Sequence, residues 1–253
     1  MNETAELSLA IQGLYKIFDR YPRPTKIEYC PCGCTKPDEV SGLLAVPLKD
    51  LKFSSLENYS FSAMSTQGSV EDFKYFLPRL FEGIVQEPYG YDPEILFGKL
   101  RYGSWLTWDF GEILALRRYL EALWRSGLRS YPIDREIPAF GEIETLLASL
   151  ATTGDQLERY LAIWSEKRDT AANRHFIQFV TMYGSDFAGG KSLSFGFWSN
   201  LPGQSKALRD WILKPDSLDR VARFKELLPL DGYEHLFNPA FQVLQAELAA
   251  IRS

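Results

Sequence analysis

The sequence is poor in the residue types that most often build catalytic and metal centres. Its 253 residues include 2 His and 3 Cys, and neither the zinc-protease motif H-E-x-x-H nor the nucleophile motif G-x-S-x-G occurs. We therefore interpret His175, on a predicted helix, and His235, in a predicted loop, as structural residues. The sequence predicts no catalytic residue and no cofactor other than the zinc ion considered below.

Long apolar runs and an excess of positive charge are also missing. No apolar run approaches the ~18 residues that a membrane-spanning helix needs, and residues 1–6 lack the basic start of a signal peptide. The 28 Lys and Arg are outnumbered by 33 Asp and Glu, for a net charge of −5, whereas nucleic-acid-binding proteins carry a basic surface. The composition predicts a soluble, cytoplasmic protein that binds neither nucleic acid nor membrane.

Hydrophobic and aromatic residues are plentiful. Hydrophobic residues make up 45% of the chain, and 17 Phe, 13 Tyr and 6 Trp are present, enough for a substantial core and for an aromatic-rich interface. The length fits one helical domain, 1–253. A subdivision into a part that contains the Cys residues, 1–104, and a part made of helix pairs, 105–253, is the alternative.

Apolar residues recur at helical spacing over most of the chain, which predicts an all-α fold. The strongest pattern starts at Thr107 and places Leu116, Leu120 and Leu123 on one face, with Gly127 as the expected C-cap. The other expected helices cover residues 7–18, 38–45, a segment that follows a capping box at 54–57, 70–86, 92–102, 141–152, 155–167, 170–182, 204–213, 216–228 and 239–251. Asp155, Asp216 and Asn238-Pro239 are the expected starts of three of them.

Two arrangements of these helices are compatible with the sequence. Trp124, Trp164 and Trp211 stand at similar places in three predicted helices, each of which is followed by a second helix. Such spacing is typical of stacked helix-pair repeats of the α-solenoid kind, which we prefer. A multi-helix bundle with a Trp in the core of each helix explains the same pattern. Segments 177–183 and 193–198 are rich in β-formers and could pair as one short β-hairpin, although we prefer a helix for the first and an irregular loop for the second.

A Cys- and Pro-rich loop interrupts the N-terminal part. Cys30, Cys32 and Cys34 alternate along it, and thiolates are strong ligands for zinc. A structural zinc site needs four ligands, so the fourth would come from His175, His235 or a carboxylate. Two interpretations are open: the three cysteines hold a zinc ion, or they are three plain thiols in a turn.

The segment Gly184–Ser192 imitates a phosphate-binding loop. The pattern G-x₄-G-K-[ST] needs a glycine six residues before Lys191, where Ser185 stands instead. The residues that follow do not read as the helix that such a loop requires. We interpret the segment as a plain loop.

A basic face on the helix that begins near Thr107 is the candidate partner-binding site. Arg118, Arg125 and Arg129 share the side opposite the leucine stripe. Guanidinium groups bind carboxylates and phosphates well, so this face is suited to an acidic group of a partner. A solvated helix face is the alternative interpretation.

Three segments within residues 30–80 carry a resemblance to known sequences. They are Cys30-Pro31-Cys32-Gly33-Cys34, Leu43-Leu44-Ala45-Val46-Pro47-Leu48 and Asp72-Phe73-Lys74-Tyr75-Phe76-Leu77-Pro78. Together they resemble an uncharacterised family of bacterial proteins with a Cys-Pro-Cys-Cys loop and an Asp-Phe-Lys-His-Phe-Leu-Pro segment. The resemblance implies no activity. Here Gly33 is an extra residue and Tyr75 replaces the His, so a metal site that uses this His would lack a ligand.

These observations favour a non-enzymatic protein-binding module. An immunity-type antagonist of a bacterial toxin is the preferred role, because such proteins are acidic and carry no catalytic motif, and a basic toxin domain would be the matching partner. A thiol- or metal-dependent enzyme that uses the Cys loop is the first alternative. A helical scaffold or regulatory subunit is the second.

Overall fold

The predicted all-α multi-helix fold is confirmed. The computed structural model describes residues 3–33, 35–86, 92–133, 137, 139–227, 232 and 234–252. Across these ranges the chain is 75% helical, with twelve α-helices and no strand or sheet. None of the helices in the described ranges is long and apolar enough to cross a membrane.

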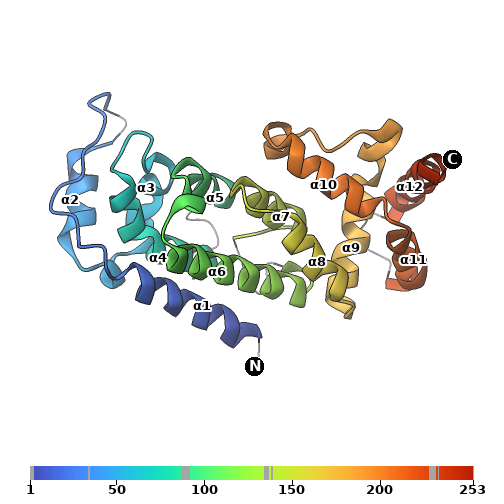
Figure 1. Ribbon diagram of the computed structural model, residues 1–253, viewed down its shortest axis with the longest axis horizontal. Helices are drawn as coiled ribbons and strands as arrows, with labels where there is room; N and C mark the ends of the chain where they lie inside the picture. The colour runs from blue at the N-terminus through green and yellow to red at the C-terminus, as the bar shows by residue number, and fades with distance from the viewer. Residues whose placement is uncertain are drawn as a thin grey trace.

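The helices form an elongated body (Figure 1). The first half contains α1 (Glu3–Phe18), α2 (Pro37–Ala45), η1 (Leu48–Asp50), η2 (Phe53–Leu56), α3 (Glu57–Ser62), α4 (Val70–Gln86), α5 (Pro93–Tyr102), η3 (Trp105–Thr107) and α6 (Phe110–Arg129). The second half contains α7 (Ile143–Thr152), α8 (Glu158–Glu166), α9 (Thr170–Tyr183), η5 (Gly184–Gly190), η6 (Gly196–Asn200), α10 (Pro202–Ile212), α11 (Pro215–Phe224), η7 (Lys225–Leu227) and α12 (Glu234–Arg252). Helices α2 and α3 lie at one end of the body, α11 and α12 lie at the other, and α1 runs beside α6 along the lower edge.

Local capping signals place several helix starts where the sequence predicts them. The Ser69 hydroxyl accepts from the amide of Asp72 at 3.1 Å and the Ser69 amide donates to the Asp72 carboxylate at 2.7 Å, a capping box at the start of α4. Asp92 accepts from the amide of Ile95 at 3.0 Å and begins α5. Helix α4 continues through Pro78 instead of splitting there.

The strongest predicted helix has different ends from those expected. Residues Trp105–Thr107 form a 3₁₀ turn, and α6 begins at Phe110 after the N-cap Asp109. Gly127 is not the C-cap, because α6 continues to Arg129. A Cβ at Gly127 would lie 2.6 Å from a methyl carbon of Leu146, so this glycine serves close packing of α6 against α7.

Four other expected helix starts were wrong. The capping box expected at 54–57 does not form, because residues Phe53–Leu56 are a 3₁₀ turn and α3 begins at Glu57 without a side-chain cap. Helix α8 begins at Glu158, because Asp155 accepts two hydrogen bonds of 3.0 Å from Arg117 instead of capping a helix. Helix α11 begins at Pro215, and Asp216 lies in its first turn. Helix α12 begins at Glu234 and includes Pro239. For Asp155 the cause is a contact with Arg117, which is distant in the sequence and which no local pattern reveals.

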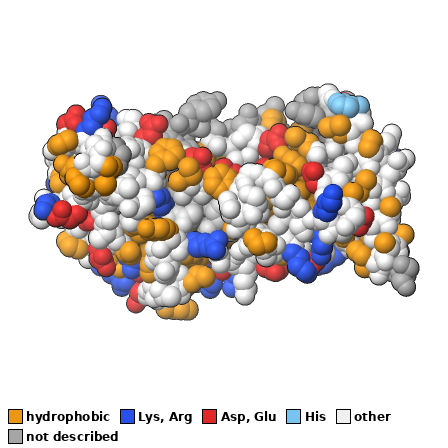
Figure 2. Space-filling view, turned by 90° about the horizontal axis from the view of Figure 1, so that it is seen from above, with side chains coloured by type: hydrophobic (Ala, Val, Ile, Leu, Met, Phe, Trp, Pro, Cys, Tyr) orange, Lys and Arg blue, Asp and Glu red, His pale blue; other side chains and the backbone are white. Residues whose placement is uncertain are grey.

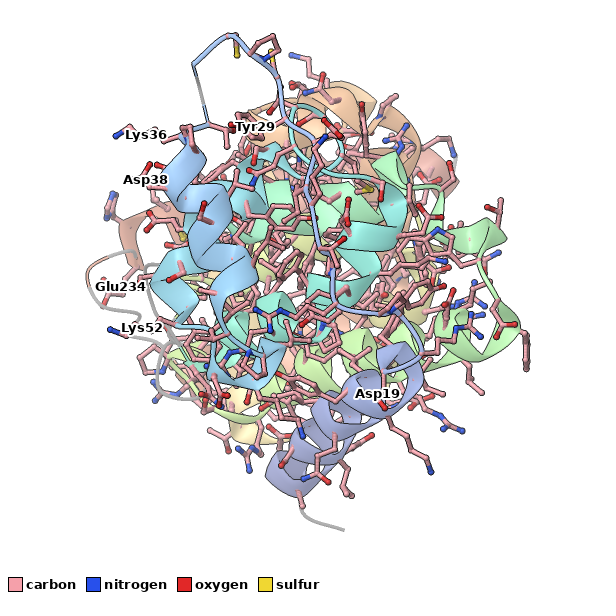
Figure 3. All side chains as sticks on the ribbon, turned by 90° about the vertical axis from the view of Figure 1, so that its left-hand side faces the viewer. Asp19, Tyr29, Lys36, Asp38, Lys52 and Glu234 are labelled. Carbon is pink, nitrogen blue, oxygen red and sulfur yellow. The ribbon has the colours of Figure 1, made fainter. Side chains whose placement is uncertain are left out.

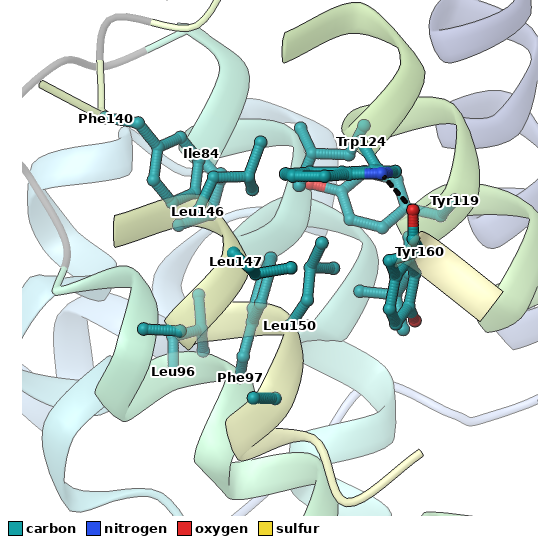
Figure 4. Close-up of a cluster of buried hydrophobic side chains, with 14 of the residues drawn as sticks. Ile84, Leu96, Phe97, Tyr119, Trp124, Phe140, Leu146, Leu147, Leu150 and Tyr160 are labelled. Carbon is teal, nitrogen blue, oxygen red and sulfur yellow. Dashed lines mark hydrogen bonds between the residues drawn. The ribbon is translucent and has the colours of Figure 1, made fainter. Parts of the chain in front are cut away.

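One continuous cluster of buried side chains runs from Leu7 in α1 to Leu244 in α12, part of it drawn in Figure 4. The indole rings of Trp124 and Trp164 meet edge to face at 5.5 Å between centroids, and Trp164 stacks on Trp211 at 5.2 Å. Each indole N–H donates a hydrogen bond; that of Trp124 reaches the carbonyl of Tyr160 at 2.8 Å. The three tryptophans therefore build one core cluster, which explains their recurrence without a repeat. The alternative subdivision of the chain into parts 1–104 and 105–253 stays a prediction.

The alternative of a β-hairpin is excluded. Residues 177–183 belong to α9, and residues 193–198 contain an extended stretch followed by the 3₁₀ turn η6. Isolated bridges join Gln67 to Tyr29 and to Ala63, but they do not extend into a sheet within the described residues. The preferred interpretation of both segments is confirmed.

Candidate functional site

A network of ionic hydrogen bonds around one buried carboxylate joins the end of α1 to α4 and α6. The carboxylate of Glu112, which is 0% exposed, accepts from Tyr21 Oη at 2.5 Å, Arg20 Nη2 at 2.6 Å and Lys74 Nζ at 3.0 Å. Burial alone would raise the pKa of Glu112, but these hydrogen bonds outweigh burial and lower it. The network joins the residues after α1 to α4 and to the start of α6, so α1 runs antiparallel to α6 (Figure 1).

A groove of about 530 Å³ lies between α1 and α6 on their outer side. Its lining combines small residues with larger aliphatic ones: Leu9, Ala10, Gly13, Ile17, Gly111, Leu114 and Ala115. A Cβ added at Gly13 would meet nothing within 4 Å, so the backbone there faces open space. The opposite face of α1, with Leu7, Leu14 and Phe18, is buried in the core.

Exposed apolar side chains gather around this groove. Leu9 is 51% exposed and Leu114 is 37% exposed, and both line it. Phe110 is 79% exposed, the highest value among the exposed large hydrophobic residues, and stands one helical turn before Leu114. Single exposed apolar residues are common on proteins, whereas a cluster beside a concave surface is typical of an interaction site.

The charged side chains that line the groove differ between its two ends. Because α1 and α6 are antiparallel, Glu6 of α1 lies toward the same end as Glu121 of α6, and Lys16 lies toward the end of Gly111. Arg118 also lines the groove, one helical turn before Glu121 and therefore nearer to the acidic end. The acidic and basic ends make the groove electrostatically asymmetric.

The structure brings only one of the predicted partner-binding residues to this site. Arg118 is exposed and lines the groove, whereas Arg125 and Arg129 are partly buried and are not among the lining residues. Sequence reasoning missed Phe110 and Leu9. The spacing of Phe110 and Leu114 at i and i+4, just after a capping residue, is the signal that could have pointed to them.

The Cys loop projects from the end of the body near α2 (Figure 3). Its base is held by the amide of Cys30, which donates to the Thr66 carbonyl at 2.8 Å, while the Cys32 side chain is exposed. Cys34 lies outside the described residues. No group of three His, Cys, Asp or Glu suited to a metal occurs in the ranges that the structure describes, and zinc at this loop stays a prediction.

Neither histidine can complete a metal site there. His175, in α9, is 1% exposed, and its Nε2–H donates to the Ser130 carbonyl at 2.7 Å. His235 belongs to α12, at the opposite end of the molecule from α2 (Figure 1). A fourth zinc ligand would have to be a carboxylate.

Another cleft, of about 470 Å³, lies on the other side of α1. In it the Tyr15 hydroxyl donates to Glu82 at 2.6 Å, and Arg79 donates to the same carboxylate oxygen at 2.7 Å. These groups satisfy one another and tie α1 to α4. They therefore read as a structural contact rather than as a reactive site.

Three acidic residues that lie near turns, Asp109, Glu112 and Glu144, also have hydrogen-bond partners. Asp109 and Glu112 form the capping box of α6, while Glu144 accepts from the indole N–H of Trp198 at 2.5 Å. Glu94 is the most perturbed carboxyl group: burial first, and then the charges of Asp92 and Glu144, raise its pKa to about 7. The Thr152 hydroxyl lies beside it but donates to the backbone carbonyls of Glu94 at 3.1 Å and of Ser149 at 2.7 Å, and a perturbed pKa alone does not define a catalytic site.

Charges of both signs mix on the surface. Figure 2 views the molecule from above and shows acidic and basic side chains interspersed with hydrophobic ones, without a basic stripe on that face. Comparison of the chain with protein-family models, with curated proteins and with solved structures gives no match. The resemblance to the bacterial Cys-Pro-Cys-Cys family stays a prediction.

Proposed function

We propose that this chain is a non-enzymatic protein-binding module that accepts an amphipathic helix of a partner protein in the groove between α1 and α6. The observation that carries the proposal is that two exposed apolar side chains line the groove, Leu9 at 51% and Leu114 at 37%, while Phe110, 79% exposed, stands one helical turn before Leu114. Fully burying a side chain of this size contributes about 1.5–3 kcal/mol. A partner that covered Phe110, Leu114 and Leu9 would gain this energy from surface that is now in water.

The dimensions of the groove suit a helix. Between Glu6 and Ile17 the axis of α1 rises by about 16 Å, at roughly 1.5 Å per residue, which matches about three turns of a partner helix. Small residues on the floor, Ala10, Gly13 and Ala115, allow a close approach. Helix-in-groove recognition uses apolar side chains at positions i, i+3 or i+4, and i+7, and the groove offers apolar walls to such a row.

The charges at the two ends select the direction of the bound helix. A basic end faces Glu6 and Glu121, and an acidic end faces Lys16. Acidic residues stabilise a helix at its N-terminus and basic residues at its C-terminus. The favoured ligand therefore runs parallel to α6, with its acidic N-terminus near Lys16.

An immunity-type antagonist of a bacterial toxin is the role that we propose for this module. The net charge of −5 supports a basic partner domain, and the acidic end of the groove would receive the basic end of a toxin helix. A scaffold or regulatory subunit would use the same groove with a partner inside a larger assembly, so the identity of the bound protein distinguishes the two roles.

Site-specific photocrosslinking in the native cell tests the proposal. A photoreactive phenylalanine analogue replaces Leu9 or Leu114 in the groove, or Leu236 in α12 as a control, because Leu236 and Leu114 are each 37% exposed. We expect both groove positions to crosslink one partner, through residues of a single amphipathic helix. Crosslinking no stronger than that at Leu236, or crosslinking only to a second copy of this chain, would contradict the proposal.

A further inference from the structure

The loop that imitates a phosphate-binding sequence holds an anion in this structure, and the anion is a side chain of the protein itself. The amide of Gly189 donates to one carboxylate oxygen of Glu247 at 2.7 Å, and the amide of Gly190 donates to the other at 2.9 Å. Both glycines have positive φ angles, +67° and +70°, a backbone conformation that residues other than glycine rarely adopt. The two successive amides thus point at the same carboxylate.

Helix α12 delivers Glu247 to the loop. Ala240, Leu244 and Glu247 stand at i, i+4 and i+7, on one face of the helix, and the first two are buried. At Gly184 an added Cβ would lie 3.0 Å from the Cβ of Ala240, so η5 and α12 approach closely there. The contact at Glu247 is the polar and more exposed end of the same interface.

Positive groups adjoin the two amides. Arg209 Nη1 donates to the carbonyl of Gly190 at 2.5 Å, which places its guanidinium beside the loop, while its Nε and Nη2 donate to the Asp210 carboxylate at 3.1 and 2.8 Å. Lys191 follows directly in the chain and is exposed. Successive backbone amides next to cationic side chains form the kind of concavity that binds phosphate groups in proteins.

We propose that the amides of Gly189 and Gly190 form a binding site for a phosphate group, and that Glu247 is the built-in competitor for this site. A phosphate ligand and the Glu247 carboxylate exclude each other, because both need the same two N–H donors. Binding of phosphate therefore breaks the two hydrogen bonds of Glu247, the polar end of the contact between α12 and the loop. The site stands apart from the α1–α6 groove, so this inference does not depend on the proposed function.

Nuclear magnetic resonance of the backbone amides tests the inference. Inorganic phosphate is titrated into the full chain, into Glu247→Ala and into Glu234→Ala, with sodium chloride at equal ionic strength as the reference. We expect saturable shifts of the Gly189 and Gly190 amides in Glu247→Ala, with a dissociation constant in the millimolar range. Affinity in the unsubstituted chain and in Glu234→Ala, which alters α12 away from the loop, should be at least about tenfold weaker.

A second variant, Glu247→Gln, tests the inference if Glu247→Ala does not fold. Glu247→Gln keeps the size of the side chain but removes its charge, so phosphate should bind with an affinity between those of the unsubstituted chain and of Glu247→Ala. Shifts that are no larger with phosphate than with chloride, in both Glu247 variants, would overturn the inference. So would equal phosphate affinity in Glu247→Ala and Glu234→Ala.

Discussion

The guanidinium of Arg220 in α11 donates a hydrogen bond of 3.0 Å to the carbonyl oxygen of Trp164 in α8. Arg220 is 3% exposed, and its other hydrogen bonds go to the carbonyls of Lys167 and Ala172 and to the side-chain oxygen of Asn173. Burial lowers the pKa of Arg220 to about 9. Carbonyls at the end of a helix lack hydrogen-bond donors within the helix. At the end of α8, Arg220 is the donor.

Replacing Arg220 is expected to destabilise the protein strongly. In Arg220→Met the apolar volume stays similar, but several buried oxygens lose their donors, at about 1–3 kcal/mol for each unsatisfied group. We expect urea unfolding to show a loss of at least about 3 kcal/mol. Arg223→Met, at an exposed position of the same helix, serves as the control and should change the free energy of unfolding by less than about 0.5 kcal/mol. Equal effects of the two substitutions would contradict the role of Arg220.

The network around Glu112 is expected to behave as a unit. Removing one partner from a buried ion pair costs about 3–5 kcal/mol, so Glu112→Gln and Lys74→Met should each lower the free energy of unfolding. Because both substitutions break the same contact of 3.0 Å, the double variant should lose less than the sum of the single losses. Additive losses in urea unfolding would show that the two groups are not coupled.

Glu94 is expected to make stability depend on pH. Its pKa in the folded protein is raised to about 7, above the ordinary value of 4.5, so the folded state holds the proton more tightly than the unfolded state does. The resulting stabilisation is complete below pH 4.5 and is lost as the pH rises through 7. The free energy of unfolding of the unsubstituted chain minus that of Glu94→Gln should therefore decrease between pH 4.5 and pH 8.

Two comparisons make the pH experiment specific to Glu94. Burial lowers the pKa of His175 to about 4, which gives stability the opposite dependence on pH, but this contribution is common to both proteins and cancels in the difference. Glu226→Gln, at an exposed position, controls for the loss of one negative charge. A difference for Glu94→Gln that is flat with pH, or that increases, would contradict the raised pKa.

Gly127 is expected to tolerate no side chain although it lies within a helix. Alanine is favoured over glycine in helices by about 1 kcal/mol, but a Cβ here would lie 2.6 Å from Leu146 and 2.9 Å from Ile133. Overpacking costs about 1–3 kcal/mol, so Gly127→Ala should lower the melting temperature. Gly98→Ala in α5, where an added Cβ meets nothing within 4 Å, should raise it. An increase for both variants would show that α7 yields to the added methyl group.

Signals that act within one turn of the chain allowed much of the fold to be predicted. The capping box at Ser69 and the N-cap at Asp92 hold in the structure because the interacting groups are three residues apart. Gly127 and Asp155 were misread because their roles depend on Leu146 and Arg117, which are distant in the sequence. Local pattern cannot show which glycine faces a neighbouring helix.

The candidate site was less predictable than the fold. Arg118 was found from its place on the polar face of a helix, whereas Leu9 and Phe110 have the same residue types as core positions. Whether an apolar residue is covered depends on how α1 packs against α4 and α6, and residues distant in the sequence take part in that packing, as Glu112 does through Arg20 and Lys74. The opposite case is Arg220, a charged residue on a short helix that lies in the core.

The most direct test of the central claim fills the groove without disturbing the core. Gly13→Leu adds a side chain where nothing lies within 4 Å, and leucine favours a helix more than glycine does, so the melting temperature should stay the same or rise. Gly203→Leu in α10 also points into open space and is the matched control. We predict that Gly13→Leu weakens binding of the partner crosslinked at Leu114 by at least about tenfold, or 1.4 kcal/mol, while Gly203→Leu binds as the unsubstituted chain does. Unchanged affinity in a folded Gly13→Leu protein would contradict the assignment of the α1–α6 groove as the binding site.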